Sequence, residues 1–559
     1  ECLKIRGGWF SNNSNGKLAT GSGNYVVSPS TVQTLTSGTE YEAGYNYHVI
    51  TKYTVTWKDA AGNTLQTQQY NRNDMPKYGT TGEFVPTDGN TYEFTGWTPE
   101  IAPVTADVTY TAVFKKYEAE VIVPGAATSK RYEHFADAWT DAQQLQNCTL
   151  RLLSNVNSSV QLTYNPAPPA GSAEGDLEYF TNATTTIDLN NHTLAYTGTA
   201  DRFLIVNKSG SVLKVADNST AKGGKLDVTK SYNGNLICTV VQNGELVLES
   251  GQISAQNSYD GKGSRAVMPL VNAVFTVNGG KVQAKAKTDA RAINNDGNAT
   301  VNITGGTIYA STEYATDTWG ANAYGVIMWN TGTTNISGNP TITAEAASGA
   351  LGVYAYGTTG KINIDGGTIN ATTKTAGSAR CVLSANNGTV VINDGTFTAR
   401  TATTAAFGAY ADTNGKMTIN GGVFDAQNAL GNTSMIWNIE GLRVAAGANV
   451  TVNGGTFTAS KGASPMAVGV RGGTTTINGG TFNSTRGLYA MDYADATQTA
   501  TVTINGGTFI GTAEAVRVES KNRVIDSETT YKANANVTVN GGYFYSTGSS
   551  IVSLIQTTD

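Results

Sequence analysis

One ten-residue pattern of apolar and polar positions recurs along most of the chain. In the copy that begins at Val450, apolar side chains stand at Val450, Val452, Phe457 and Ala459, with Asn-Gly-Gly between the two pairs. Each pair has the period of two that is typical of a half-buried strand. The step from Val452 to Phe457 is odd, so a straight strand would place the two pairs on opposite faces. The pattern therefore predicts two short strands joined by a corner at residues 453–455.

The same phrase returns at intervals of 25 to 35 residues. Self-similarity at this period indicates a repeat protein. At ~3.3 Å per strand residue, one interval has room for about three short strands and their corners, which is the coil of a parallel β-helix. Leucine-rich repeats fit worse, because no Leu-x-x-Leu-x-Leu series occurs. The second position of the glycine pair, with His192 as its first equivalent, falls at His192, Gly224, Gly251, Gly280, Gly306, Gly338, Gly367, Gly395, Gly422, Gly455, Gly480, Gly507 and Gly542.

Stacked coils would place equivalent residues in columns. Glycine adopts positive φ at little cost, and Asn tolerates it better than most residues, so both suit the corner. Phe and Ile would form an apolar column inside, and stacked corner amides would hydrogen-bond along the axis. We interpret the corner column as a structural ladder and not as an array of ion or ligand sites. Its members are Asn278, Thr304, Asp365, Asn393, Asn420, Asn453, Asn478, Asn505 and Asn540.

One amphipathic helix precedes the array. Its apolar residues, which share one helical face, are Phe135, Ala138, Trp139, Ala142 and Leu145. A helix at this point would cover the first coil and protect its edge from pairing. The predicted fold class is all-β: a capping helix and a right-handed parallel β-helix of about 13 coils over residues 132–559, plus a small β-grasp-like module.

Residues 48–117 have a different pattern. Residues 53–57 and 110–114 alternate with period two, and residues 59–62 and 88–90 have turn chemistry. With Phe94-Thr-Gly-Trp-Thr-Pro, they resemble the Listeria–Bacteroides repeat, the InlB B-repeat type of β-grasp-like module. The resemblance implies a spacer or stalk module of an extracellular bacterial surface protein, and it implies no catalysis. Residues 118–131 are expected to be a linker.

The array itself resembles the pectate-lyase-like β-helices of bacterial surface and secreted proteins. The resemblance rests on the helix, the strand-like residues 149–153 and the first phrase at 186–194. It implies the architecture, and enzymatic activity does not follow from a fold. Acidic residues are thinly spread, whereas lyases and glycosidases need clustered carboxylates. We therefore expect no enzyme and assign no catalytic residue; a polysaccharide lyase or hydrolase is the less favoured alternative.

A stray copy of the phrase, Arg6-Gly-Gly-Trp-Phe10, stands near the start of the chain, in residues 1–47. A single coil cannot bury its apolar face without a stacked neighbour. Placed after Gly542 and Asp559, Gly8 would follow Gly542 by 25 residues, as within the array. We therefore expect residues 1–47 to be the terminal coil and tail of a preceding or neighbouring β-helix. Packing on the C-terminal end of the same chain is an alternative. The candidate junction residues are Leu3, Ile5, Trp9, Phe10, Phe544, Ile551 and Leu554.

The composition disfavours several classes of binding partner. The net charge is −5 and no basic run occurs, which disfavours nucleic acid. No apolar run approaches the ~20 residues that span a bilayer, so we expect no membrane span. The four cysteines (Cys2, Cys148, Cys238, Cys381) are far apart, and only three histidines are present. We expect buried free thiols at Cys148, Cys238 and Cys381, and no metal or cofactor.

The function predicted from these features is structural. We expect an extracellular protein, on the bacterial cell surface or secreted, that forms a rigid stalk or fibre from copies of itself. These copies would stack head to tail or lie in tandem. The alternative is a monomeric adhesin that binds glycans or a host surface. For that alternative, aromatic residues near an insertion could form a sugar platform: Trp319, Tyr324, Trp329, Tyr354 and Tyr356.

Overall fold

In the computed structural model, the chain forms two units. The first contains residues 1–118 and 132–134, and the second contains residues 119–131 and 135–559. Each unit is described by itself. The structure describes residues 3–558 except 14–16, 20–24, 28–29, 36–40, 42, 80–83, 173–179, 314–321, 358, 376, 403, 429–437, 492–498, 527–528, 533–534 and 549.

The first unit is organised on one long strand, β3 (Tyr47–Lys58). The first part of β3 pairs antiparallel with β1 (Gly8–Phe10) and with β2 (Ser30–Thr34). Its second part pairs antiparallel with β4 (Thr64–Asn71) and parallel with β6 (Val108–Tyr117), which in turn pairs with β5 (Thr91–Thr98). Two hairpins joined by a central parallel pair give the order β4-β3-β6-β5. The domain boundary expected between residues 47 and 48 therefore lies within strand β3.

Two small cores lie along β3. Beside its second part, Val55 and Trp57 are buried with Val104 and Tyr110, and the Trp57 ring lies 4.7 Å from those of both Trp97 and Tyr110. A second core lies beside the first part of β3 and contains Leu18, Val26 and Val49, with Ile5, Phe10, Val32 and Tyr47 packed against it.

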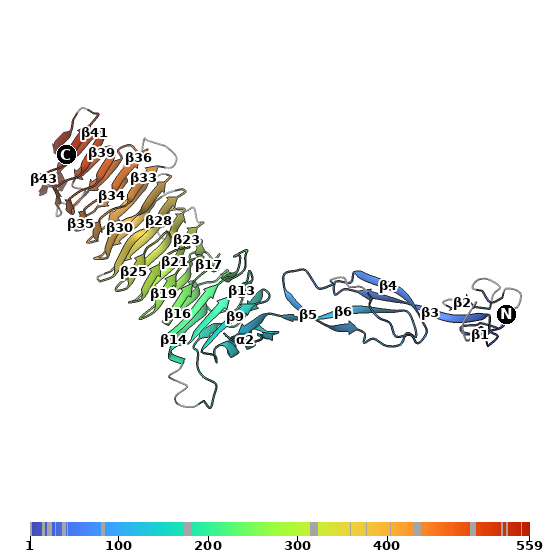
Figure 1. Cartoon of the computed structure of the whole chain (residues 1–559). Coiled ribbons are helices and arrows are strands. Elements are labelled where there is room, and N and C mark those ends of the chain that lie inside the picture. The colour runs from blue at the N-terminus through green and yellow to red at the C-terminus, as the bar shows by residue number, and fades with distance from the viewer. Residues whose placement is uncertain are drawn as a thin grey trace. The chain divides into compact units, whose positions relative to one another are not determined.

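The second unit is the predicted parallel β-helix (Figure 1). Equivalent strands of successive coils pair in parallel, as in Met417 with Val450 and Val450 with Thr475. Each coil contributes to three sheets: the corner-entry sheet before the Asn-Gly-Gly phrase, the corner-exit sheet after it, and the return sheet. Several long strands bend and contribute to two of them.

The corner-entry sheet contains β9 (Asn147–Leu152), β12 (Thr184–Asp188), the second halves of β14 (Arg202–Ala216) and β16 (Leu236–Leu248), β19 (Val274–Val277), β22 (Thr300–Ile303), β25 (Thr333–Ile336), the first halves of β28 (Lys361–Thr373) and β30 (Thr389–Thr401), β32 (Lys416–Ile419), β35 (Asn449–Val452), β38 (Gly473–Ile477), β40 (Ala500–Ile504) and β43 (Ala535–Val539).

The corner-exit sheet contains β10 (Val156–Ser158), β13 (Thr193–Tyr196), β15 (Lys225–Lys230), β17 (Gln252–Asn257), β20 (Lys281–Ala286), β23 (Thr307–Thr312), β26 (Thr341–Ala346), the second halves of β28 and β30, β33 (Val423–Asn428), β36 (Thr456–Ser460), the first parts of β39 (Thr481–Met491) and β41 (Thr508–Asp526), and β44 (Tyr543–Ser546).

The return sheet contains β11 (Leu162–Tyr164), the first halves of β14 and β16, β18 (Gly263–Pro269), β21 (Asp289–Asp296), β24 (Asn322–Trp329), β27 (Gly349–Tyr356), β29 (Ser378–Ala385), β31 (Ala405–Ala411), β34 (Asn438–Val444), β37 (Met466–Val470), the later parts of β39 and β41, and β45 (Val552–Thr558); β42 (Thr529–Lys532) pairs antiparallel with β41.

The expected apolar column fills the interior behind the corners. Five successive ring pairs stack from Phe397 to Phe544, with centroids 4.4–5.1 Å apart and planes within 18° of parallel. The rings from Phe397 to Phe509 are fully buried. Fully burying such a side chain contributes about 1.5–3 kcal/mol, so this column is a main source of stability.

The predicted helix caps the first coil. Helix α2 (Phe135–Ala142) buries Phe135, Ala138, Trp139 and Ala142 and packs on β9 and β7 (Ala119–Ile122). Strand β7 pairs antiparallel with β9, and β8 is Lys130–Tyr132, so residues 118–131, expected as a linker, contain two strands. Helix and antiparallel strand together cover the edge that a parallel array would otherwise expose.

Candidate functional site

The corner column forms a hydrogen-bonded ladder along the β-helix. Each amide Nδ2 donates to the side-chain oxygen of the equivalent residue one coil earlier in the chain. The distances are 2.5 Å from Asn393 to Asp365, and 2.6–2.9 Å for the later steps. The ladder runs through Asp365, Asn393, Asn420, Asn453, Asn478, Asn505 and Asn540, and a shorter one runs through Glu249, Asn278 and Thr304.

The chemistry of its first member sets the direction of the long ladder. An ionised carboxylate only accepts hydrogen bonds, so Asn393 must donate to Asp365. Once Asn393 has used its Nδ2 in this way, its Oδ1 faces the next coil and accepts from Asn420. The same choice then propagates to Asn540. The ladder ends on the Oδ1 of Asn540, which accepts no hydrogen bond from the described residues.

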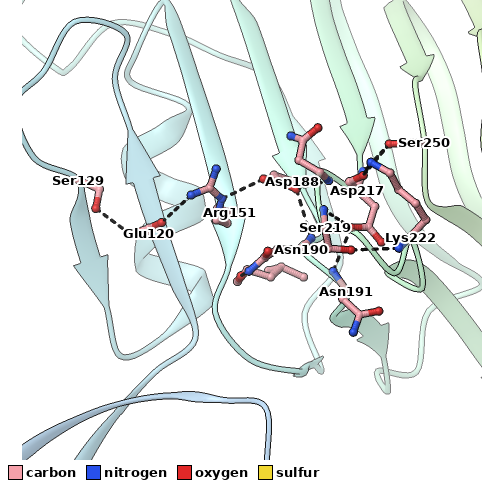
Figure 2. A network of polar contacts seen from close by, with 12 residues as sticks. Glu120, Ser129, Arg151, Asp188, Asn190, Asn191, Asp217, Ser219, Lys222 and Ser250 are labelled. Atoms are coloured by element: carbon pink, nitrogen blue, oxygen red, sulfur yellow. Dashed lines mark hydrogen bonds and ion pairs between the residues drawn. The ribbon is translucent and has the colours of Figure 1, made fainter.

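The corners of the first coils are built differently (Figure 2). Arg151 Nε donates to the buried carboxylate of Asp188 at 2.9 Å, and its Nη1 lies 3.3 Å from Glu120. Asp188 also accepts from the backbone N–H groups of Asn190 and Asn218, at 3.2 and 3.0 Å. These part-buried contacts join the corners of the first coils, so the cluster is a structural substitute for the ladder.

A second buried carboxylate, Asp217, holds the loop that follows. It accepts from the backbone N–H groups of Asn191, Ser219 and Gly224, the last at 2.6 Å (Figure 2). Burial alone would raise the pKa of Asp217, but the hydrogen bonds from Ser219, Gly224 and Asn191 outweigh it, so its pKa lies below the ordinary value. The side chain is completely buried, so it stays charged only through these bonds.

The last coil exposes the apolar residues expected at a junction. Leu554 is 77% exposed and Ile551 52%; Tyr543, which was not predicted, is 80% exposed. Phe544 ends the ring stack and is half-buried, in contrast to the fully buried rings before it. Strands β43 and β44 pair only with the preceding coil among the described residues. This end therefore offers a strand edge and an apolar surface of the size of one coil.

Residues 3–10, the other half of the expected junction, lie in the first unit. Strand β1 pairs with β3, where Trp9 stacks on His48 with ring centroids 3.3 Å apart. Leu3 is 57% exposed and Trp9 40%, whereas Ile5 and Phe10 pack on the core around Val26. Ile5 also pairs in parallel with Val26, 21 residues later. Successive coils of the β-helix also pair in parallel, at larger separations of 25 to 35 residues.

The stray phrase has the local geometry of a coil corner. Gly8 has a φ of 128°, and its counterpart Gly542 has a φ of 122°. A Cβ on Gly8 would lie 3.3 Å from the ring of Phe10, and one on Gly542 would lie 3.3 Å from the ring of Phe544. The residues from 6 to 10 therefore turn as a β-helix corner turns, although their partner is the antiparallel strand β3.

Four of the five predicted aromatic contacts come together on the return sheet. Tyr324 and Tyr354 stack with centroids 6.3 Å apart, and Trp329 and Tyr356 meet edge to face at 5.0 Å. Parallel register explains this, because Trp329 is paired with Tyr356 on the next coil. All four are half-buried, and burial raises the pKa of both Tyr324 and Tyr354. Trp319 lies outside the described residues.

A polar cavity of about 390 Å³ adjoins this aromatic group and was not foreseen. Arg291 connects the two: its guanidinium lies 5.3 Å from the ring centroid of Tyr324, and it shares Asp289 with Arg265. Burial and the nearby Arg291 lower the pKa of Arg265. Residues lining the cavity include Asp201, Tyr232, Asn235, Arg265, Arg291 and Asp296. Up to 95 residues separate them in the chain, so only the coil registers could have grouped them.

The thiols are as expected. Cys148, Cys238 and Cys381 are buried and free. Burial raises the pKa of Cys148 to about 11 and raises those of Cys238 and Cys381 further. Among the described residues, no group of three or more His, Cys, Asp or Glu side chains could hold a metal ion. Within the same part of the chain, no helix is both long and apolar enough to cross a membrane.

Comparison of the chain with protein-family models, with curated proteins and with solved structures found no match.

Proposed function

We propose that this protein is a structural component of a bacterial surface, a rigid shaft lengthened by stacking the C-terminal coil of one copy on residues 3–10 of another. The observation that carries the proposal is the coil-corner geometry of Arg6-Gly-Gly-Trp-Phe10, outside the β-helix. The two copies are separate chains or consecutive segments of one tandem chain.

The proposed contact continues every column of the β-helix. Superposing Gly8 on the position that follows Gly542 places Phe10 over Phe544, which extends the ring stack, and Ile5 over Val539. Val539 is 53% exposed, so it gains an apolar cover. Strand β1 pairs with β3 on one side and has no other described partner. Its second edge is free to add to another sheet, which is a common mode of protein association.

The test is the sedimentation of the whole chain over a range of concentrations. Wild-type protein is expected to form end-to-end species, and Leu554→Glu is expected to abolish them by placing a charge in the apolar contact. The matched control is Val423→Glu, because Val423 is also exposed (47%) but lies in the middle of the shaft. Association that is absent in the wild type, or equally affected by both variants, would refute the proposal.

A second function, binding of a glycan by a surface adhesin, is favoured by the cavity beside Arg291. Its volume of about 390 Å³ lies within the ~300–1,000 Å³ of small-molecule sites. It offers both donors and acceptors, as sugar hydroxyls require. Titration with a panel of monosaccharides, followed by NMR of the protein, tests this function; unchanged spectra at saturating sugar would exclude it.

A further inference from the structure

We propose that Arg6 is the last member of the ladder of another copy: its guanidinium donates to Oδ1 of Asn540, and Gly7 lies against the Asn540 backbone carbonyl. This inference rests on the stacking proposed above and identifies the polar residues that select the partner. The partner is a second copy of this chain, presenting residues 3–10.

The donor and acceptor chemistry of the ladder leads to Arg6. Asp365, its first member, only accepts, and each Asn between accepts on one side and donates on the other. The Oδ1 of the exposed Asn540 is therefore the ladder oxygen that can accept a hydrogen bond from a next coil. At the corner position of the stray phrase stands Arg6, whose guanidinium only donates. A ladder that begins on an acceptor-only group and ends on a donor-only group leaves no amide with an unused partner.

The free state of Arg6 agrees with this role. Arg6 is exposed, and its guanidinium makes no hydrogen bond or ion pair with the described residues. Its backbone carbonyl, in contrast, accepts from Ser30 Oγ at 2.9 Å and from Thr51 Oγ1. The backbone at Arg6 is thus fixed in the first unit while its side chain remains available.

Gly7 gives an independent observation. Within the β-helix, the first glycine of each phrase has room for no Cβ, because the corner carbonyl of the preceding coil would lie too close. For Gly541, Gly506 and Gly479, that carbonyl oxygen would lie 2.6–2.7 Å from a Cβ. At Gly7 the nearest described atom, the Val49 carbonyl oxygen, would lie at 3.6 Å, an ordinary contact. The fold of the first unit therefore does not require glycine here, whereas a coil stacked below favours it: most coils carry glycine at this position, and Ser250, Ser337 and Asp394 are exceptions. In the proposed contact the corner carbonyl below Gly7 belongs to Asn540.

The contact between Arg6 of one copy and Asn540 of another is directional. An acceptor end meets a donor end, so the C-terminal coil of one copy selects the N-terminal phrase of the next. Such a heterologous contact does not close on itself unless a rotation brings the ends together, and it produces open chains.

Charge exchange tests the contact in the whole chain by sedimentation. Arg6→Glu is expected to weaken association about tenfold or more, since it replaces a charge-assisted hydrogen bond with acceptor against acceptor. Asn540→Lys alone places cation against cation and weakens it as well. The double variant, Arg6→Glu with Asn540→Lys, restores most of the affinity. Arg72→Glu is the matched control, an exposed arginine of the same unit changed by the same charge.

Gly7→Ala supplies a second variant. The melting temperature of the first unit is expected to stay unchanged, because the added Cβ makes only an ordinary contact there, while association falls. If Leu554→Glu abolishes association and the Arg6, Asn540 and Gly7 variants leave it unchanged, this inference is wrong and the stacking stands. If the double variant is no better than either single variant, the pairing of Arg6 with Asn540 is wrong. If wild-type protein does not associate, both proposals fail.

Discussion

Different contacts hold the corner residues at the two ends of the β-helix. In the coils after Asp365, one small phrase is repeated, and each corner contacts its neighbours through the same amide bond and the same ring. In the first coils, Arg151, Asp188 and Asp217 make ion-pair and backbone contacts that do not recur from coil to coil (Figure 2). Repetition distributes stability evenly over many equal contacts, whereas the first coils concentrate it in a few buried charges.

The largest effect is expected in the ring stack of the regular coils. Phe457 is fully buried between Phe424 and Phe482, at 4.6 and 5.1 Å. Phe457→Ala should lower the free energy of unfolding by about 3–5 kcal/mol, because it leaves a cavity that the stacked coils cannot close. Urea unfolding followed by circular dichroism measures this loss in the free energy of unfolding. The neighbouring Thr456→Ala is the control; equal losses for the two variants would contradict an interior role for the stack.

An intermediate effect is expected at the buried carboxylate of the first coils. Asp217→Asn weakens three backbone hydrogen bonds and should cost about 1.5–3 kcal/mol at neutral pH. The pKa of Asp217 is lowered by folding, so its contribution is present above the ordinary value near 3.8 and is lost as the pH falls through the folded value. The stability difference between wild type and variant should therefore shrink below about pH 4. A difference independent of pH would show that the carboxylate charge is not what stabilises this corner.

The smallest effect is expected at a single step of the exposed ladder. Asn453→Ala removes the bond to Asn420 and the bond from Asn478, both at 2.7 Å and both open to solvent. The expected loss is about 1 kcal/mol, because water replaces part of what is lost. Asn453→Asp keeps the acceptor for Asn478 but places a carboxylate oxygen against Oδ1 of Asn420, so its loss should be at least as large as that of Asn453→Ala. A loss as large as that of Phe457→Ala would mean that the ladder, and not the interior, dominates these coils.

The sequence was sufficient for everything that repeats. The phrase around Val450 predicted the corner, the interior Phe column and the amide ladder, because each depends only on spacing and on local backbone preference. The cap was predicted for the same reason, from the helical period of Phe135 and Trp139. The resemblance to InlB B-repeats and to pectate-lyase-like proteins remains untested.

What the sequence did not reveal depends on contacts between distant positions. Nothing near Arg151 indicates that Asp188 will neutralise it, and nothing near Asp201 points to Arg291 in the same cavity. The domain boundary expected between residues 47 and 48 falls at the first residue of β3, because the composition changes there, although the continuous strand pairs with β1 and β2 in its first part and with β4 and β6 in its second. Such features follow only from the registers of strands that are far apart in the chain.

The regular parallel register of the corner column from Asn393 to Asn540 makes the length of this part of the shaft a whole number of coils. Asn420 and Asn453 occupy the same place in successive coils, with Met417 paired to Val450 just before them. Removing residues 421–453 would join Asn420 directly to Gly454 and bring equivalent side chains into contact. The shortened shaft would keep both ends and lose one rise of about 4.8 Å. The length of the shaft can thus be changed in steps of one coil, while the remaining coils keep their pairing.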